Sequence, residues 1–421
     1  MRALLVSLVA LSACGPLTPI KVDAGSAGGT AGAGGGFSFG GGMATGGGVA
    51  TGGGVATGGG MATGGGVATG GGIATGGGVA TGGGVATGGG VATGGGLATG
   101  GGSVGPFTWQ SMSMVPVPST TTGAAITARS GEAWMTAGTA LYRSTGGTFT
   151  QLSGFSLVSN AKDVLVTPAG KVFVVSGNTT SMYCTAADCT VASNFVAAPS
   201  GGSSDYFDGL CNSGETVYAI GNGNSSQAIL FEFNGTGWTK VSNDLGFPSP
   251  RRCIAGPAGE VYVLGRNFVV RYEGGGFSQE NVNLMGQSSA EWNDMAFTFG
   301  PGAAVDAMLV GGIGSGGTMT GYRYARRDVA GGGWTALPVP MVGSTLNTIV
   351  AVGPNEYLAA GSPGSMPANR FMLWNGMTWA ASTNQPPSAL LLVNDAATST
   401  DREVFLIGNG GSGLVVIRGR R

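Results

Sequence analysis

Two short stretches combine acidic and aromatic residues, the side chains that bind sugars or hard cations in proteins. An exposed aromatic ring can stack on a sugar face while carboxylates bind its hydroxyls, and carboxylates also ligate Ca²⁺. The alternative is that the aromatic rings pack between structural units and the acids are solvated. The candidate ligand-binding residues are Asp205, Tyr206, Phe207 and Asp208 in the first stretch, and Glu291, Trp292 and Asp294 in the second.

The composition excludes several classes of chemistry. The chain of 421 residues contains no histidine, which rules out His-based acid–base catalysis, Ser-His-Asp triads and most zinc, copper and non-haem iron sites. Its 19 basic and 20 acidic residues leave a net charge of −1, so we expect no nucleic-acid partner. We also expect no cofactor and no metal centre. An enzyme of this composition would depend on carboxylates, Tyr, Lys or Arg.

Other charged residues recur with the period of a repeat. A catalytic acid is normally unique, so an acid that recurs once per repeat indicates a turn position. The recurring acids are Glu132, Glu215, Glu260, Glu356 and Glu403. Arg323, Arg326 and Arg327 form a small basic cluster. The alternation of solvated residues along a strand explains this cluster more simply than an anion site does.

The segments that must position these residues form a repeat of about 45 residues, the length of a propeller blade. Short apolar or alternating runs are separated by Gly, Pro, Asn and Ser, which predicts all-β structure. Seven such units occur, and each second run has a central large residue. These residues are Trp134, Phe173, Tyr218, Tyr262, Leu309, Tyr357 and Phe405. The pattern predicts a seven-bladed β-propeller over 105–421.

The first unit is preceded by a run that elsewhere ends a unit. The stretch GPFTWQSM at 105–112 matches GTGWTKVS at 235–242, which is a fourth run, whereas the chain ends after a third run, LVVIRGRR. We therefore predict that 105–112 supplies the fourth strand of blade seven. This pairing would close the ring and remove two free sheet edges.

Two motifs resemble known propeller families. Gly311-Gly312, with Tyr322 and Trp334, resembles a kelch repeat, and the sequence STGGTF at 144–149 is similar to the Asp box of sialidase propellers. The resemblance implies the propeller fold. It does not imply the activities, because kelch-type copper oxidases need histidine ligands and the arginine triad and acid pair of sialidases have no match here.

The N-terminus has the pattern of an export signal. Residues 1–13 place Arg2 before an apolar run that is too short to span a bilayer. The sequence Leu-Ser-Ala-Cys ending at Cys14 resembles the bacterial lipobox. The resemblance implies cleavage before Cys14 and its acylation, which anchors the protein in a membrane, and Gly15 after it favours the outer membrane or cell surface. A plain signal peptide with a chance cysteine is the alternative.

Residues 14–104 are dominated by Gly, Ala and Thr, with ten copies of x-A-T-G-G-G at 43–102. Hexapeptide repeats can form a β-helix. One aliphatic side chain per repeat contributes about 2 kcal/mol if buried, against roughly 6 kcal/mol for ordering six residues. We therefore favour a disordered, flexible tether over a β-helix.

Four further cysteines lie in the predicted propeller. Cys184 and Cys189 flank a short turn, and Cys211 and Cys253 occupy similar positions in the first strands of neighbouring blades. Three pairings are possible. Their positions favour 184–189 with 211–253, which an exported chain permits. Four free thiols are the alternative.

These features predict a non-catalytic binding or scaffold module for a protein or a glycan, displayed at the bacterial cell envelope. The alternative is an envelope carbohydrate-active hydrolase or lyase with paired carboxylates. Long connections at 197–207, 282–292 and 361–369 fall on one propeller face, with both candidate stretches. Paired acids about 5–10 Å apart at the channel mouth would favour the enzyme, whereas scattered acids would favour binding.

Overall fold

The computed structural model contains two compact units, Met1–Gly102 and Ser103–Arg421. In the first unit the structure describes three-residue strands between 37 and 99. In the second it describes 107–112, 124–200, 202, 205–223, 227–242, 245–282, 290–299, 305–315, 318–328, 333–337, 345–362, 371–381, 390–399, 403–410 and 413–421. Cys14, the predicted signal peptide and the predicted lipid anchor lie outside the described residues.

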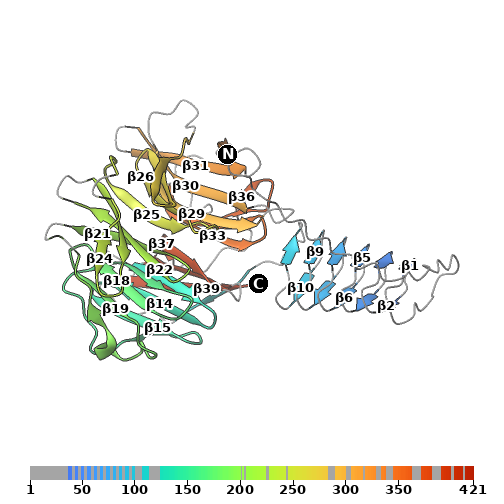
Figure 1. The fold of residues 1–421 in the computed structure, drawn as a ribbon, viewed down its shortest axis with the longest axis horizontal. Coiled ribbons are helices and arrows are strands. Elements are labelled where there is room, and N and C mark those ends of the chain that lie inside the picture. The colour runs from blue at the N-terminus through green and yellow to red at the C-terminus, as the bar shows by residue number, and fades with distance from the viewer. Residues whose placement is uncertain are drawn as a thin grey trace, which may run out of the picture. The chain divides into compact units, whose positions relative to one another are not determined.

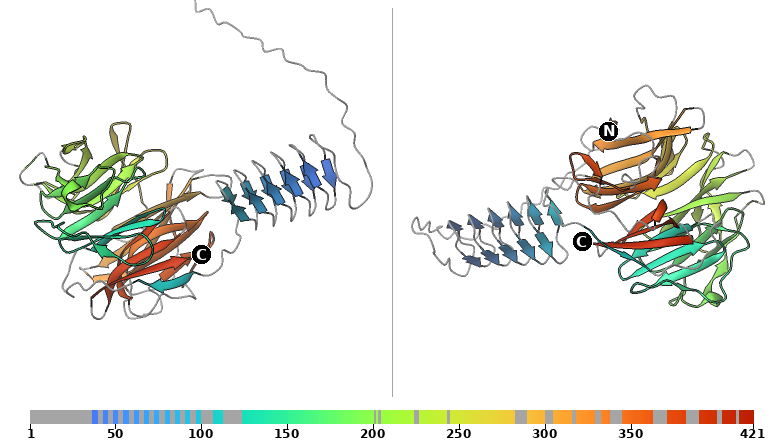
Figure 2. Two further views of the ribbon diagram at one scale, coloured as in Figure 1. Left: turned by 90° about the horizontal axis from the view of Figure 1, so that it is seen from below. Right: turned by 180° about the vertical axis from the view of Figure 1, so that it is seen from behind.

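The second unit is an all-β, seven-bladed β-propeller, as predicted (Figures 1 and 2). Its described residues form seven four-stranded antiparallel sheets. In blades one to six the strands follow chain order from the first, innermost strand outward, and in blade seven the outermost strand is β12. The first strand of each blade contacts the first strand of the next, and that of blade seven contacts that of blade one, so the ring is closed.

The strands of the first four blades have the following bounds. Blade one contains β13 (Ala124–Arg129), β14 (Glu132–Ala137), β15 (Ala140–Ser144) and β16 (Thr150–Gln151). Blade two contains β17 (Ala161–Val166), β18 (Val172–Ser176), β19 (Ser181–Cys184) and β20 (Val196–Ala197), with a 3₁₀ turn at Ala192–Asn194. Blade three contains β21 (Tyr206–Ser213), β22 (Thr216–Asn222), β23 (Ala228–Phe233) and β24 (Trp238–Lys240). Blade four contains β25 (Pro250–Ala255), β26 (Val261–Gly265), β27 (Phe268–Glu273) and β28 (Gly276–Gln279).

The remaining blades continue the same order. Blade five contains β29 (Glu291–Phe299), β30 (Val305–Ser315), β31 (Thr318–Asp328) and β32 (Gly333–Leu337). Blade six contains β33 (Thr345–Gly353), β34 (Glu356–Ser362), β35 (Phe371–Trp374) and β36 (Trp379–Ala381). Blade seven contains β37 (Leu390–Thr398), β38 (Val404–Gly410), β39 (Gly413–Arg420) and β12 (Thr108–Ser111).

Blade seven is closed by the strand from the N-terminal side, which confirms the prediction for 105–112. β12 pairs antiparallel with β39, with Thr108 opposite Arg420. Phe107 and Met112, on either side of β12, are 3% and 4% exposed. The strand therefore contributes apolar burial as well as backbone pairing.

The second strand of each blade is apolar on both faces because it lies between two neighbouring blades. In β18, Val172 and Val174 pack in the same core cluster as Trp134 of blade one. The intervening Phe173 packs in the next cluster with Phe231 of blade three. Successive strand residues point to opposite faces of a sheet. A continuous run such as VFVV is therefore what a blade interior requires.

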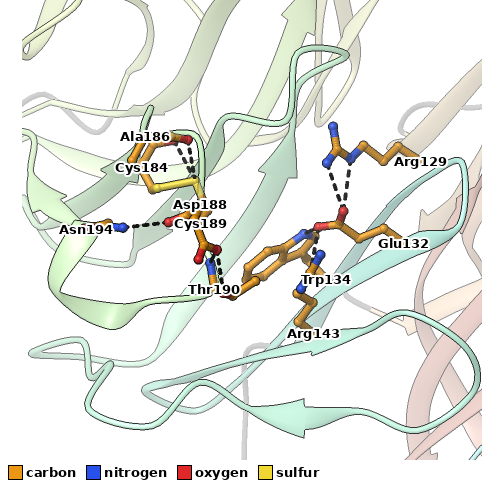
Figure 3. Close-up of a disulfide and its surroundings, with 10 residues drawn as sticks. All are labelled: Arg129, Glu132, Trp134, Arg143, Cys184, Ala186, Asp188, Cys189, Thr190 and Asn194. Carbon is orange, nitrogen blue, oxygen red and sulfur yellow. Dashed lines mark hydrogen bonds and ion pairs between the residues drawn. A yellow bond between two sulfur atoms is a disulfide. The ribbon is translucent and has the colours of Figure 1, made fainter.

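Both predicted disulfides are confirmed. Cys184–Cys189 closes the connection between the third and fourth strands of blade two, and Cys211–Cys253 joins the first strands of blades three and four. Figure 3 shows the first bridge beside the side chains around Glu132.

The first unit differs from the disordered tether that the sequence favoured. Its described three-residue strands form two parallel sheets, and in each sheet a strand pairs with the strand two repeats away, as Val79 pairs with Val91. One sheet contains β1 (Phe37–Phe39), β3 (Val49–Thr51), β5 (Met61–Thr63), β7 (Ile73–Thr75), β9 (Val85–Thr87) and β11 (Leu97–Thr99). The other contains β2 (Met43–Thr45), β4 (Val55–Thr57), β6 (Val67–Thr69), β8 (Val79–Thr81) and β10 (Val91–Thr93). An energy estimate for one isolated repeat omits this pairing of backbone groups between repeats.

No helix within the described residues is both long and apolar enough to cross a lipid bilayer.

Candidate functional site

The first strands of blades two to seven share a β-bulge near their starting ends. In each strand a residue interrupts the pairing register with the second strand, and β33 and β37 each have one further register shift. A bulge re-aims its side chains and is often found beside functional sites. The bulged residues are Lys162, Asp208, Arg251, Asn293, Asn347 and Asn394.

A glycine late in the second strand makes room for the bulge. An added Cβ at Gly221 would lie 1.6 Å from the carbonyl oxygen of Tyr206, and one at Gly311 would lie 1.9 Å from that of Glu291. No side chain fits at such distances. The glycine that follows the aliphatic and aromatic residues in most second strands is therefore the sequence signal for a bulge in the first strand.

Three aspartates, Asp163, Asp294 and Asp395, each follow a bulged residue and connect one blade to the next. We call them the clasp aspartates. Each uses one carboxylate oxygen to accept a backbone N–H of its own strand and the other to accept a backbone N–H in the first strand of the next blade. The inter-blade donors are Leu210 to Asp163 at 2.8 Å, Ile349 to Asp294 at 2.9 Å and Ile126 to Asp395 at 2.9 Å. Two bulged asparagines add a second contact of this kind, Asn293 to the Leu346 carbonyl at 2.8 Å and Asn347 to the Val393 carbonyl at 2.7 Å.

Arg252 occupies the clasp position of blade four and reaches toward the clasp aspartates of other blades. Its Nη2 lies 2.5 Å from Asp395 Oδ1, and its Nε lies 3.4 Å from Asp294 Oδ1. Asp395 belongs to blade seven, which is not a neighbour of blade four in the ring. The guanidinium therefore spans the channel and ties blades four, five and seven together.

We call Arg252 and the three clasp aspartates the central cluster. Their charges perturb one another's pKa values. Burial lowers the pKa of Arg252, but Asp294, Asp395 and Asp163 raise it more, so the guanidinium stays charged. Burial raises the pKa of Asp163 to about 7, with a further increase from Asp395 and an opposing effect of Arg252. Asp163 has no ion pair with Arg252 in the described part of the chain, whereas the other two aspartates do. Burial likewise raises the pKa of Asp294, against the opposing effect of Arg252.

The joint between blades three and four has a covalent bond in place of a clasp. Gly209 stands at the clasp position of blade three, so no carboxylate is available there. The disulfide joins Cys211 of that strand to Cys253 of the next blade, with a Cα–Cα distance of 5.5 Å. The bridge thus strengthens a joint that lacks the aspartate.

The bulged residues of blades two to four are charged and lie at one mouth of the channel, where the first strands begin. We call Lys162, Tyr206, Asp208, Arg251 and Glu291 the mouth sector. Lys162 and Arg251 are exposed, and Tyr206 is 47% exposed. Arg251 Nη2 lies 3.2 Å from Glu291 Oε1. Lys162, Tyr206 and Arg251 are thus exposed to solvent, whereas Asn293 and Asn347 bond the next blade.

Asp208 is the least solvated acid of the mouth sector. Its Oδ2 accepts a hydrogen bond from Asn222 Nδ2 at 2.6 Å. Burial raises its pKa, although Lys162 and Arg251 act in the opposite direction. The Oδ1 of Asn222 is buried and has no hydrogen-bond partner among the described residues. The Asp208–Asn222 pair is therefore a polar feature held in a fixed orientation beside the exposed Tyr206.

The structure divides the sequence-predicted residues into two groups. Tyr206, Asp208 and Glu291 belong to the mouth sector. The other candidates are structural: Phe207 is fully buried and Trp292 is 2% exposed, both in cores between blades. Their prediction as exposed aromatic anchors was wrong because alternation along the strand turns each ring away from the channel mouth.

The two remaining acidic candidates are also structural. Asp205 is 3% exposed, and its Oδ1 lies 2.9 Å from Lys240 Nζ. Asp294 is a clasp aspartate whose Oδ2 also accepts the Thr348 hydroxyl at 2.8 Å. Neither carboxylate is available to a ligand, which corrects their assignment as binding residues.

The recurring glutamates are bound within the fold, as expected of a turn position. Glu132 bonds Arg129, Arg143 and the Trp134 indole N–H (Figure 3). Glu215 accepts the Ala169 N–H of blade two at 2.7 Å. The remaining glutamates bond groups at or near the ends of strands: Glu260 accepts the Ala258 N–H, Glu356 pairs with Arg421, and Glu403 pairs with Arg418 and Arg420.

The basic cluster of blade five is likewise committed to internal contacts. Arg326 Nε lies 2.9 Å from Asp306 Oδ1, and Arg327 donates to the Tyr262 hydroxyl. Nothing is described for the side chain of Arg323. Among the described residues, no group of three or more acidic, cysteine or histidine side chains is arranged to hold a metal ion.

Sequence reasoning missed Lys162, Arg251 and Arg252. The signal was a dipeptide at a fixed position of the first strand, Lys-Asp, Asp-Gly, Arg-Arg, Asn-Asp, Asn-Thr and Asn-Asp in blades two to seven. Alignment of the units on their second-strand glycines places these dipeptides together.

No protein-family model matches the chain. No curated protein matches it. Solved structures match it at the level of fold. A catalytically inactive virginiamycin B lyase from Staphylococcus aureus with quinupristin has a TM-score of 0.55 and 12% identity, over 75% of this chain and 100% of that one. YCF48 bound to D1 peptide has a TM-score of 0.52 and 16% identity, over 75% and 96%.

A third match is the extracellular domain of a one component system from B. thetaiotaomicron, with a TM-score of 0.51 and 11% identity over 73% of this chain. The present chain spans 40% of the length of that protein. At such identities the comparisons show the propeller fold and carry no residue-level information.

Proposed function

We propose that the propeller is a non-catalytic binding module that captures a glycan or protein partner through the mouth sector. The observation that carries this proposal is the asymmetry of the bulged residues. Asn293 and Asn347 bond the next blade, whereas Lys162, Asp208 and Arg251 present charge at the mouth beside the exposed Tyr206. Tyr and Arg are the residue types that dominate recognition surfaces.

The central cluster favours a ligand that binds on one face of the propeller over a ligand that passes through the central channel. Arg252 bridges the channel to Asp395 at 2.5 Å. Beneath the mouth the clasp aspartates accept backbone N–H groups, and Asp294 and Asp395 also pair with the guanidinium of Arg252. The acids that remain at the mouth, Asp208 and Glu291, are each bonded to a neighbouring side chain.

The enzyme alternative has less support. The lyase among the structural neighbours was solved as an inactive variant in which a histidine is replaced by alanine, and this chain contains no histidine. Among the candidate acids that could serve as paired carboxylates, Asp294 is held by two backbone N–H groups and the hydroxyl of Thr348. The peptide-bound neighbour agrees with a binding role for a propeller of this fold.

A glycan array and a library of envelope-derived peptides, screened with the full-length protein, test the proposal. We expect a retained ligand that is recovered unchanged and is lost with Tyr206→Ala. Turnover of a retained polysaccharide, abolished by Asp208→Asn, would contradict the binding role and favour a carbohydrate-active enzyme.

We further propose that the protein is exported and lipid-anchored through Cys14 at the bacterial outer membrane or cell surface. The lipobox-like sequence supports the anchor, and two disulfides support an oxidising compartment. Cys14→Ser should move the protein from the membrane fraction to the soluble fraction. Unchanged membrane fractionation would contradict the anchor.

A further inference from the structure

A recess lies at the opposite end of the channel from the mouth sector. It has a volume of about 300 Å³ and is formed where the first strands of blades three, four and five end. Ligand pockets start at about this volume. The lining residues used below are Asn212, Ser213, Ala255, Gly256, Phe297 and Thr298.

The recess exists because blade four has small residues where another blade has larger ones. Ala255-Gly256 in the stretch IAGPAGEVY aligns with Val166-Thr167 in LVTPAGKVF of blade two. In blade two the Thr167 hydroxyl bonds Glu215 at 3.0 Å and fills the joint to the next blade. In blade four an added Cβ at Gly256 would lie 2.3 Å from Glu260 Oε1. The acid therefore turns back onto its own loop, where it accepts the Ala258 N–H, and does not line the recess.

The lining combines one aromatic ring with neutral polar groups. Phe297 is partly exposed, and its ring is held against Tyr262 at a centroid distance of 5.3 Å. Thr298 donates its hydroxyl proton to the Gly353 carbonyl at 2.7 Å, so its oxygen remains able to accept. Asn212 Nδ2 donates to the Gly214 carbonyl at 2.7 Å, which leaves its Oδ1 as an acceptor. None of the described lining residues is ionisable.

This chemistry selects a ligand class. A charged ligand would lose hydration without gaining an ion pair, which is costly. A purely apolar ligand would leave the hydroxyl and amide groups unpaired. A sugar ring has one apolar face for the aromatic ring and a rim of hydroxyls for Ser213, Thr298 and Asn212. We propose that this recess binds a single neutral hexose unit, independently of the mouth sector.

The test is saturation-transfer NMR on the full-length protein with glucose, galactose, mannose and N-acetylglucosamine, and with glucosamine and gluconate as charged probes. We expect at least one neutral sugar to bind saturably and both charged probes to bind at least five-fold more weakly. Ala255→Leu, which fills the recess, should abolish the signal. Ala169→Leu, in the corresponding exposed turn of blade two, should leave it unchanged.

Two further variants keep the test informative if Ala255→Leu does not fold. Ser213→Ala and Thr298→Val each remove one hydroxyl and should weaken binding several-fold. Tyr206→Ala should leave sugar binding at the recess intact, which separates this site from the mouth sector. No saturable binding of any neutral sugar, equal binding of the charged probes, or wild-type binding by Ala255→Leu would overturn the proposal.

Discussion

Replacement of Arg252 by methionine should destabilise the propeller severely, because Asp294 and Asp395 would lose the cation that pairs with them. The methionine side chain keeps most of the length and apolar stem of arginine. The variant would leave Asp395 and Asp294, now 2.5 and 3.4 Å from the guanidinium, without a counter-charge in a site where the arginine side chain is only 24% exposed. Removal of one partner from a buried ion pair costs about 3–5 kcal/mol. The partial exposure favours the lower end of this range, about 3 kcal/mol.

Arg251→Met is the matched control, because the neighbouring arginine lies in the same strand and pairs with Glu291 at the surface. Its side chain is 50% exposed, so its loss should cost about 0–1 kcal/mol. The assay is urea-induced unfolding followed by tryptophan fluorescence, at pH 8 and pH 5. The deficit of Arg252→Met should shrink at pH 5, where the unpaired carboxylates can take up protons. A cost below about 1 kcal/mol at pH 8, equal to that of the control, would refute the role of the central cluster.

Three further predictions concern stability. Deletion of 105–112 removes the buried Phe107 and Met112, whose burial stabilises the fold by about 1.5–3 kcal/mol each, and it exposes an edge of blade seven. We expect a lower melting temperature and oligomers in size-exclusion chromatography. A monomer with unaltered melting would argue against closure of the ring by this strand. Loss of the Cys211–Cys253 disulfide, whose cysteines are 42 residues apart, should cost about 4 kcal/mol of stability on the loop-entropy scale. Loss of Cys184–Cys189, with a separation of 5 residues, should cost about 2 kcal/mol. Equal melting shifts for the two double alanine variants would contradict this ranking. Burial raises the pKa of Asp163 to about 7 in the folded state, against roughly 3.9 when unfolded. The folded state therefore binds this proton more tightly, and the contribution of Asp163 to stability falls as pH rises from about 4 to 7. Urea titrations should show that Asp163→Asn flattens this fall, and an unchanged pH profile would exclude the assignment.

The sequence predicted most of the fold because the physical constraints on a blade are local. A second strand buried on both faces needs a continuous apolar run such as VFVV, and a propeller needs its first and last strands to meet. These two facts were sufficient for the seven blades and for the closure by 105–112. The cysteine pairs followed from equivalent positions in neighbouring blades.

The site was harder to predict because it depends on which side of a strand a residue faces. Alternation along the strand turns Phe207 and Trp292 into the core, whereas Asp208 lies at the bulge and turns to the mouth. The role of Arg252 depends on a contact with Asp395, 143 residues away. No local pattern contains that information. The repeats at 43–102 were judged one at a time, whereas their pairing in the structure is a property of the array.

The most direct test of the account is the affinity of the full-length protein for whichever ligand the screens retain, measured by calorimetry for wild type and for single variants. Tyr206→Ala and Arg251→Ala should each weaken binding about ten-fold or more, the effect expected of central recognition residues, with melting temperatures unchanged. Phe277→Ala, at an exposed aromatic residue of the outer strand of blade four that is 38% exposed, should bind as wild type does. Equal affinities for all four proteins, or a loss with Phe277→Ala alone, would contradict a binding site at the channel mouth.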